Sequence, residues 1–173
     1  MATIGNEPTI RQALEAQARK NPDRVYLRFE DQIVTVGELD RRVNRLANGL
    51  AALGFSPGDR VAIMLPNHPD HFYTFLACTK LGLVQVPVNT NLRGASLDFL
   101  VAHADPHGLI ADIRYADALL PALAGTKCKT AIWRGGMAEV PRARLHAFDA
   151  VMAAGHDGPP PGAPRHDDVL SLS

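Results

Sequence analysis

The chain has 173 residues and a mass of 18.7 kDa, which is the size of a single domain. Hydrophobic residues make up 46% and charged residues 21%, so the chain can bury a core, which excludes intrinsic disorder for most of it. Eighteen Lys and Arg balance eighteen Asp and Glu, and this neutrality argues against nucleic acid as a partner. No apolar run is long enough for a transmembrane segment, and no secretory signal is visible. Cys78 and Cys128 lack the spacing of a disulfide framework, so we expect a cytoplasmic protein.

The first third of the sequence predicts a helix, a short hairpin and a long amphipathic helix. Their ranges are about 10–20, 25–29 with 33–34, and 39–53. Thr9 is a suitable N-cap for the first helix. Thr35 and Glu38 have the spacing of a capping box before the long helix, and Gly54 ends that helix.

From residue 61 onward, strands and helices alternate. The predicted strands are 61–65, 84–88, 108–111 and 129–133, and the predicted helices are 69–81, 95–104, 115–123 and 144–154. This alternation predicts βαβ units and a parallel sheet, so the fold class is α/β. Residues 155–166 form a Pro/Gly-rich loop, and 168–172 begin one more strand.

Three familiar site motifs fail on inspection. The segment 54–58 matches GxSxG, but it joins a helix to a strand, and Pro57 lacks the N–H that an oxyanion hole needs. The pairs His68/His71 and His103/His107 lack the spacing and partners of a metal site, so we assign no metal ligands. Neither GxGxxG nor GxxxxGK[ST] occurs, which argues against a free-standing dinucleotide or nucleotide binder. Residue types alone therefore give an α/β domain without an assigned function.

The order of several segments is more informative. Thr35-Val36-Gly37-Glu38-Leu39 resembles the T-Y-x-E-L opening of the AMP-forming acyl-CoA synthetase, or adenylate-forming, superfamily, although Gly37 stands where a larger residue is usual. The similarity continues through residues 58–67. It is clearest at Lys80-Leu81-Gly82-Leu83-Val84-Gln85-Val86-Pro87-Val88-Asn89, which is similar to that family's K-x-G-a-v-x-v-P-v-N segment. Residues 91–94 resemble the acyl-CoA ligase branch, including fatty-acyl-CoA and crotonobetaine/carnitine-CoA ligase-like members.

The resemblance implies an ATP-dependent carboxylic acid–CoA ligase. Such an enzyme first forms an acyl-adenylate and pyrophosphate from a carboxylate and ATP with Mg²⁺, and then transfers the acyl group to coenzyme A. The acyl substrate cannot be named, because the family's acyl pocket is built mostly from later residues. No ligand is expected to bind tightly to this chain alone.

In the resembled family, a Gly/Ser/Thr-rich phosphate loop follows a strand like residues 169–173. We therefore expect residues 1–173 to be a partial N-terminal domain that ends just before this loop and is inactive alone. Its partner is then the remainder of the same ligase, and no catalytic residue is assigned here. The alternative is a non-catalytic binding module derived from such a ligase. A Ser/Thr/Gly-rich segment ending in Pro-Lys-Gly after Ser173 would favour the ligase.

One candidate site residue follows from the resemblance. In the acyl-CoA ligase branch, the Asn-rich loop corresponding to residues 89–94 often carries a basic residue near the coenzyme A nucleotide. Arg93 is the basic residue of this loop. Its guanidinium suits a phosphate because its forked donors can bind two oxygens. The alternative is an exposed arginine with its head in water.

Overall fold

The structure is a computed structural model that describes residues 8–162 and Ser171. Its elements, in chain order, are α1 (Ile10–Lys20), β1 (Val25–Phe29), β2 (Gln32–Thr35), α2 (Val36–Ala52), β3 (Arg60–Met64), α3 (Pro69–Leu81), β4 (Val84–Pro87), α4 (Gly94–Ala104), β5 (Gly108–Asp112), the 3₁₀ turn η1 (Ile113–Tyr115), α5 (Ala116–Leu123), β6 (Thr130–Arg134), β7 (Arg144–Ala147) and α6 (Phe148–Ala154).

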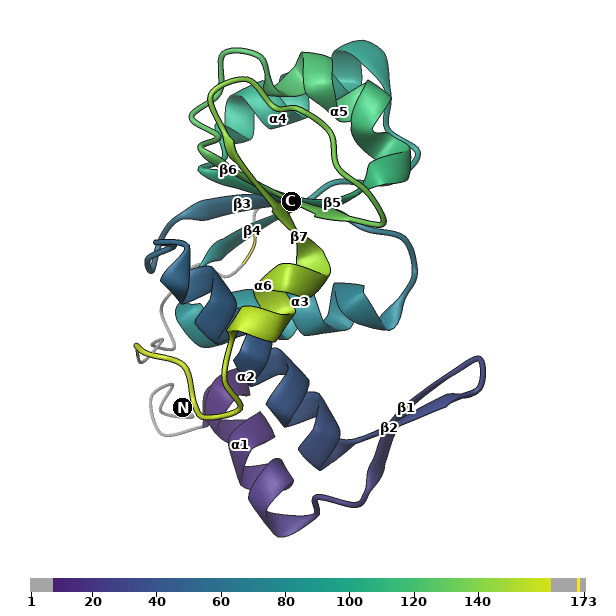
Figure 1. The fold of residues 1–173 in the computed structure, drawn as a ribbon, viewed down its shortest axis with the longest axis vertical. Coiled ribbons are helices and arrows are strands. Elements are labelled where there is room, and N and C mark those ends of the chain that lie inside the picture. Colours follow the sequence, from purple (N-terminus) through teal and green to yellow (C-terminus); the bar gives the residue numbers. More distant parts are fainter. Residues whose placement is uncertain (1–7, 163–170, 172–173) are drawn as a thin grey trace, which may run out of the picture.

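Within the described residues, five strands form a parallel sheet in the order β4-β3-β5-β6-β7, and β1 pairs with β2 in a separate antiparallel hairpin. The predicted α/β fold with a helix and hairpin before a parallel sheet is confirmed. Figure 1 shows α4 and α5 on one face of the sheet, α2, α3 and α6 on the other, and the hairpin projecting from the body.

The sheet is covered on both faces, and β3 shows why its sequence is apolar throughout. Val61 and Ile63 pack in the core shared with α2 and α3, whereas Ala62 and Met64 pack in the core shared with α4 and α5. All four side chains are at most 2% exposed. A parallel strand that is buried on both faces needs such a continuous apolar run rather than alternation.

Local capping explains where the first helices begin. Thr9 and Gln12 form a reciprocal capping box at the start of α1, because each side chain accepts from the other residue's backbone N–H. The box predicted at Thr35 is half present: its Oγ1 accepts from the Glu38 N–H at 3.3 Å, but the Glu38 carboxylate pairs with Arg42 instead. The negative first turn still favours the helix N-terminus.

The predicted helix over 144–154 is wrong in its first part. Residues Arg144–Ala147 form β7, which pairs in parallel with β6, and α6 starts only at Phe148. Leu145 packs against the α4 and α5 side of the core, whereas Phe148 and Val151 are buried on the other side. The edge of β6 offers a row of backbone hydrogen bonds that a helix could not use, so tertiary pairing overrides local preference.

The segment after α6 leads back across the molecule. Residues 155–162 form neither helix nor strand. The rest of the predicted 155–166 loop, and all of the predicted 168–172 strand except Ser171, lie outside the described residues. Ser171 forms a parallel bridge with Gln85 of β4.

A buried cation joins the helices α1, α2 and α3. The Lys80 side chain, in the last turn of α3, is 1% exposed. Its Nζ lies 2.6 Å from Asp40 Oδ1, donates to Asn44 Oδ1 at 2.7 Å, and lies 3.4 Å from Glu15 Oε1. Glu15 belongs to α1, and Asp40 and Asn44 belong to α2. A charge this deeply buried must be paired, so the network fixes α1, α2 and α3 relative to one another.

Candidate functional site

The carboxyl edge of the sheet is the first place to examine, because open parallel sheets bind ligands there. The connection after β3 leads to α3 on one face, and the connection after β5 leads to α5 on the other. These opposite directions create a topological switch point at the ends of β3 and β5. The segments that begin at this edge are 65–68, 88–93, 113–115 and 135–143.

Ion pairs occupy the ends of β5 and β6 at this edge. Asp112 and Arg134 are cross-strand partners, and Arg134 Nη1 donates to Asp112 Oδ2 at 2.8 Å. Arg134 Nε also donates to Asp70 Oδ2, at 2.6 Å, in the first turn of α3. Arg114 Nε adds a 2.9 Å bond to Asp112 Oδ1. The Asp70–Arg134–Asp112 cluster thus bridges the two strands and α3 beside the switch point.

The cluster holds Asp112 as a carboxylate. Burial alone would raise the pKa of Asp112, but the backbone N–H of Arg114 and the guanidinium groups of Arg134 and Arg114 outweigh it, so the pKa is lowered. The Asp112 side chain is only 3% exposed. These charges satisfy one another, and the cluster is therefore a structural clamp at the sheet edge rather than a free binding group.

Arg93 lies on the neighbouring loop, after β4. It is exposed and is the N-cap residue of α4. Its Nη1 donates to the carbonyls of Thr90 and Leu92, both at 2.7 Å, and its Cζ lies 5.9 Å from the centre of the Tyr115 ring. Among the described residues, Nε and Nη2 have no hydrogen-bond partner. The head group is thus held in place at the sheet edge with donors left for a ligand.

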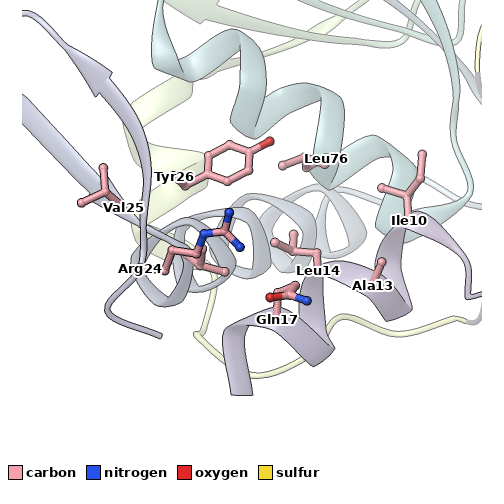
Figure 2. Close-up of a pocket in the computed structure, with 9 residues that line it drawn as sticks. Ile10, Ala13, Leu14, Gln17, Arg24, Val25, Tyr26 and Leu76 are labelled. Carbon is pink, nitrogen blue, oxygen red and sulfur yellow. The ribbon is translucent and has the colours of Figure 1, made fainter. Parts of the chain in front are cut away.

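A second feature is an apolar groove of about 530 Å³. Figure 2 shows it between α1, the start of β1 and α3. Its lining residues are Ile10, Ala13, Leu14, Gln17, Arg24, Val25, Tyr26, Val36 and Leu76. Ile10, Val25 and Tyr26 are 43%, 42% and 48% exposed, which is unusual for such large apolar side chains grouped together.

The histidines have ordinary structural roles. His68 is the N-cap of α3, where its Nδ1 accepts from the Asp70 N–H at 3.2 Å. His107 Nδ1 accepts from the Arg60 N–H at 3.1 Å, and His103 stacks on Phe99. Within residues 8–162 and Ser171, no group of three or more His, Cys, Asp or Glu could hold a metal ion. No helix among the same residues is long and apolar enough to cross a membrane.

Comparison with known proteins identifies the family. The model of the family described as AMP-binding enzyme matches residues 14–172. This chain belongs to the AMP-binding enzyme family.

Individual relatives agree with this family. The chain is 36% identical over 156 residues to a feruloyl-CoA synthase from Amycolatopsis, an alignment that covers 90% of this chain and 28% of that protein. It is 35% identical over 112 residues to a medium/long-chain-fatty-acid–CoA ligase from Mycobacterium tuberculosis, covering 65% and 19%. The fold matches that of a benzoate CoA ligase from Burkholderia xenovorans with a TM-score of 0.78 at 22% identity, covering 95% of this chain and 32% of that one. The chain thus spans about a third or less of each relative.

The segments that resemble the AMP-binding family have clear structural functions here. Thr35 caps α2, and Lys80 is the buried cation described above. Gly82 ends α3 in the left-handed conformation, with φ of 70°, so that the chain can turn directly into β4. The similarity that identified the family therefore falls largely on residues that build its scaffold.

Sequence reasoning missed the Asp70–Arg134–Asp112 cluster. Asp112 and Arg134 are 22 residues apart, and their pairing follows from the register of β5 against β6. The available signal was that each is a charged residue at the end of an apolar strand. Parallel neighbouring strands place such residues at the same edge, but the strand order was not known from the sequence.

The lowered pKa of Asp112 predicts a specific acid sensitivity. Its contribution to stability is present above the unfolded carboxyl pKa of about 3.9 and is lost as the pH falls through the lower folded value. We expect Asp112→Asn to lower the free energy of unfolding at pH 7 by ~1–3 kcal/mol, because charge-assisted hydrogen bonds are lost. Urea unfolding from pH 7 to about pH 3 should show a smaller loss of stability in acid than for the unmodified protein.

The matched control is Asp117→Asn, an exposed residue in the first turn of α5. It should change stability by less than about 1 kcal/mol, because only its interaction with the helix dipole is lost. Equal effects of the two substitutions would contradict the clamp.

Proposed function

We propose that this chain forms the N-terminal scaffold of an ATP-dependent carboxylic acid–CoA ligase. The family match over residues 14–172 and the CoA ligases and synthases among the relatives support this assignment. They do not favour the alternative of a non-catalytic binding module. The substrate class is a fatty or aromatic carboxylic acid, in keeping with the names of the two curated relatives.

The observation that carries the proposal is the bridge between Ser171 and Gln85. Because the bridge is parallel, the chain at Ser171 runs in the same direction as β4. It is therefore directed toward the carboxyl edge, where the loop with Arg93 also lies. A Gly/Ser/Thr-rich phosphate loop after Ser173, as the family resemblance implies, would extend over this edge.

The proposed reaction has two steps. In the first, a carboxylate oxygen forms a bond to the α-phosphorus of ATP, and the bond to pyrophosphate breaks, which gives acyl-AMP. In the second, the coenzyme A sulfur bonds to the acyl carbon, AMP departs, and the thiol proton passes to solvent. We assign neither step to a side chain of the described residues. Their part is to hold the sheet edge over which both reactions take place.

The described residues fit one of the implied ligands. The uncommitted donors of Arg93, Nε and Nη2, suit a phosphate of coenzyme A. The carboxylates Asp70 and Asp112 are already paired with Arg134, so we assign Mg²⁺ to no residue described here. In this proposal Mg²⁺ and the ATP phosphates are held by later parts of the ligase. The buried thiols Cys78 and Cys128 are consistent with a reducing compartment, and we place the enzyme in the cytoplasm.

The partner of this chain is the remainder of the ligase. The chain spans 28–32% of the feruloyl-CoA synthase and of the benzoate CoA ligase. The apolar groove of Figure 2, rimmed by Ile10, Val25 and Tyr26, is a surface that such a partner would cover. Large exposed apolar side chains of this kind favour association, so we expect the isolated chain to self-associate.

The assignment is tested by ATP–pyrophosphate exchange. The complete ligase should incorporate labelled pyrophosphate into ATP with at least one acid from a panel of ferulate, benzoate and octanoate. The isolated chain should give no exchange above a heat-killed control, because it lacks the phosphate loop. Exchange by the isolated chain would contradict the scaffold role, and a complete protein without exchange on any acid would contradict the ligase assignment.

A second experiment tests Arg93. In the complete ligase, Arg93→Ala should raise KM for coenzyme A roughly tenfold, the effect of losing one exposed charge-assisted hydrogen bond. Adenylate formation should be unchanged, because the thiol enters only in the second step. Arg41→Ala, an exposed substitution on α2, should change neither value. A rise in KM for ATP instead, or an equal fall in both half-reactions, would show that Arg93 does not serve coenzyme A.

A further inference from the structure

The side chain of Tyr115 lies against the guanidinium of Arg93 at the carboxyl edge of the sheet. The Arg93 Cζ is 5.9 Å from the centre of the Tyr115 ring, which is within the range of a cation–π contact. Arg93 is the N-cap of α4 and Tyr115 is the N-cap of α5, and these two helices pack together on one face of the sheet (Figure 1). The contact therefore joins the connection after β4 to the connection after β5, two strands that β3 separates in the sheet.

The turn that carries Tyr115 is itself fixed. Tyr115 is the last residue of η1, whose N-cap is Asp112. The Asp112 Oδ1 accepts from the backbone N–H of Arg114 at 3.1 Å, and its Oδ2 accepts from Arg134 at 2.8 Å. The Tyr115 side chain also packs against the buried apolar cluster between the sheet and the helices α4 and α5. The ring is thus a held surface, tied to the Asp70–Arg134–Asp112 cluster described above.

The contacts of the Arg93 guanidinium leave one particular edge available. Nη1 is committed to the carbonyls of Thr90 and Leu92, and the group lies over the Tyr115 ring. Nε and Nη2, which have no hydrogen-bond partner among the described residues, carry N–H groups on the same edge of the planar group. Two parallel donors on one edge match two oxygens of a phosphate. The bidentate edge of Arg93 is therefore the one that its neighbours leave for a ligand.

We propose that Tyr115 is a positioning residue that holds the Arg93 guanidinium in the conformer that binds a phosphate of coenzyme A. This inference rests on the function proposed above, and Tyr115 itself is assigned no contact with coenzyme A. An exposed arginine otherwise exchanges among many rotamers, and a ligand binds only the competent fraction of them. The attraction of a cation for an aromatic ring at an exposed site changes such a population by a factor of about two to five.

The restraint on Arg93 is tested first in this chain, without any ligand. The order parameter of the Arg93 Nε–H bond, measured by NMR relaxation, should be lower in Tyr115→Leu, which keeps an apolar side chain but removes the ring. Tyr115→Phe keeps the ring and should leave the order parameter unchanged. The Nε–H bond of Arg41, an exposed residue of α2, should give the same value in all three proteins. An unchanged order parameter for Arg93 in Tyr115→Leu would overturn the proposal.

The functional consequence is tested in the complete ligase with whichever acid of the panel supports pyrophosphate exchange. Tyr115→Leu should raise KM for coenzyme A about two- to fivefold with kcat unchanged, and Tyr115→Phe should restore the KM of the unmodified enzyme. Pyrophosphate exchange should be unchanged in both variants, because coenzyme A enters only in the second step. In an Arg93→Ala background, Tyr115→Leu should cause no further rise in KM, because Tyr115 acts only through Arg93.

The outcomes separate this inference from the proposed function. If Arg93→Ala raises KM for coenzyme A and Tyr115→Leu does not, or if the two effects multiply in the double variant, the positioning role of Tyr115 is wrong and the ligase assignment stands. An equal fall in both half-reactions of Tyr115→Leu would show that Tyr115 only stabilises the fold, and this too would overturn the role. If the unmodified ligase exchanges no pyrophosphate with any acid, the proposed function is wrong, and the role of Tyr115 in binding coenzyme A is rejected with it.

Discussion

The packing of α1, α2 and α3 depends on one buried positive charge. Lys80 is 1% exposed, and its ammonium group would be highly unfavourable there without partners. Asp40 and Asn44 from α2 and Glu15 from α1 supply them. The network can form only when all three helices are correctly placed, so it provides specificity of packing that apolar contacts alone do not.

The same network contacts two further parts of the chain, the segment after α6 and the turn into β4. Glu15 also pairs with Arg11, whose guanidinium donates to the carbonyl of Gly162. The Asn44 side chain bonds both the Lys80 ammonium group and the carbonyl of Asp157. On the other side, Lys80 is followed by Gly82 and β4. The position of the sheet's β4 edge is therefore tied to the packing of the first two helices, which are distant in sequence.

The sheet edge itself is divided into two parts. Near β5 and β6, the Asp70–Arg134–Asp112 cluster uses its charges internally and acts as a clamp. Near β4, Arg93 keeps donors available, and Ser171 forms a parallel bridge with Gln85. Ligand chemistry in the proposed ligase is thus expected on the β4 side.

Sequence patterns were sufficient where local rules decide the structure. The N-cap at Thr9 and the apolar run of β3 predicted their elements, and segment order predicted the family. Sequence patterns failed where pairing between distant residues decides the structure. The segment of β7 was predicted as helix, because the sequence does not show that β6 supplies its hydrogen bonds. The partners of Lys80 were likewise not predicted, because they lie 36 to 65 residues away. The role of Arg93 in binding coenzyme A remains a prediction.

The central claim, that the buried Lys80 network organises the domain, is tested most directly by Lys80→Met, which keeps the length of the side chain and removes the charge. Urea unfolding at pH 7 should show a loss of ~3–5 kcal/mol, because the carboxylate of Asp40 is left without its cation. Lys129→Met at an exposed site should change stability by less than about 0.5 kcal/mol. A Lys80→Met protein that is as stable as the unmodified chain at pH 7 would contradict this account.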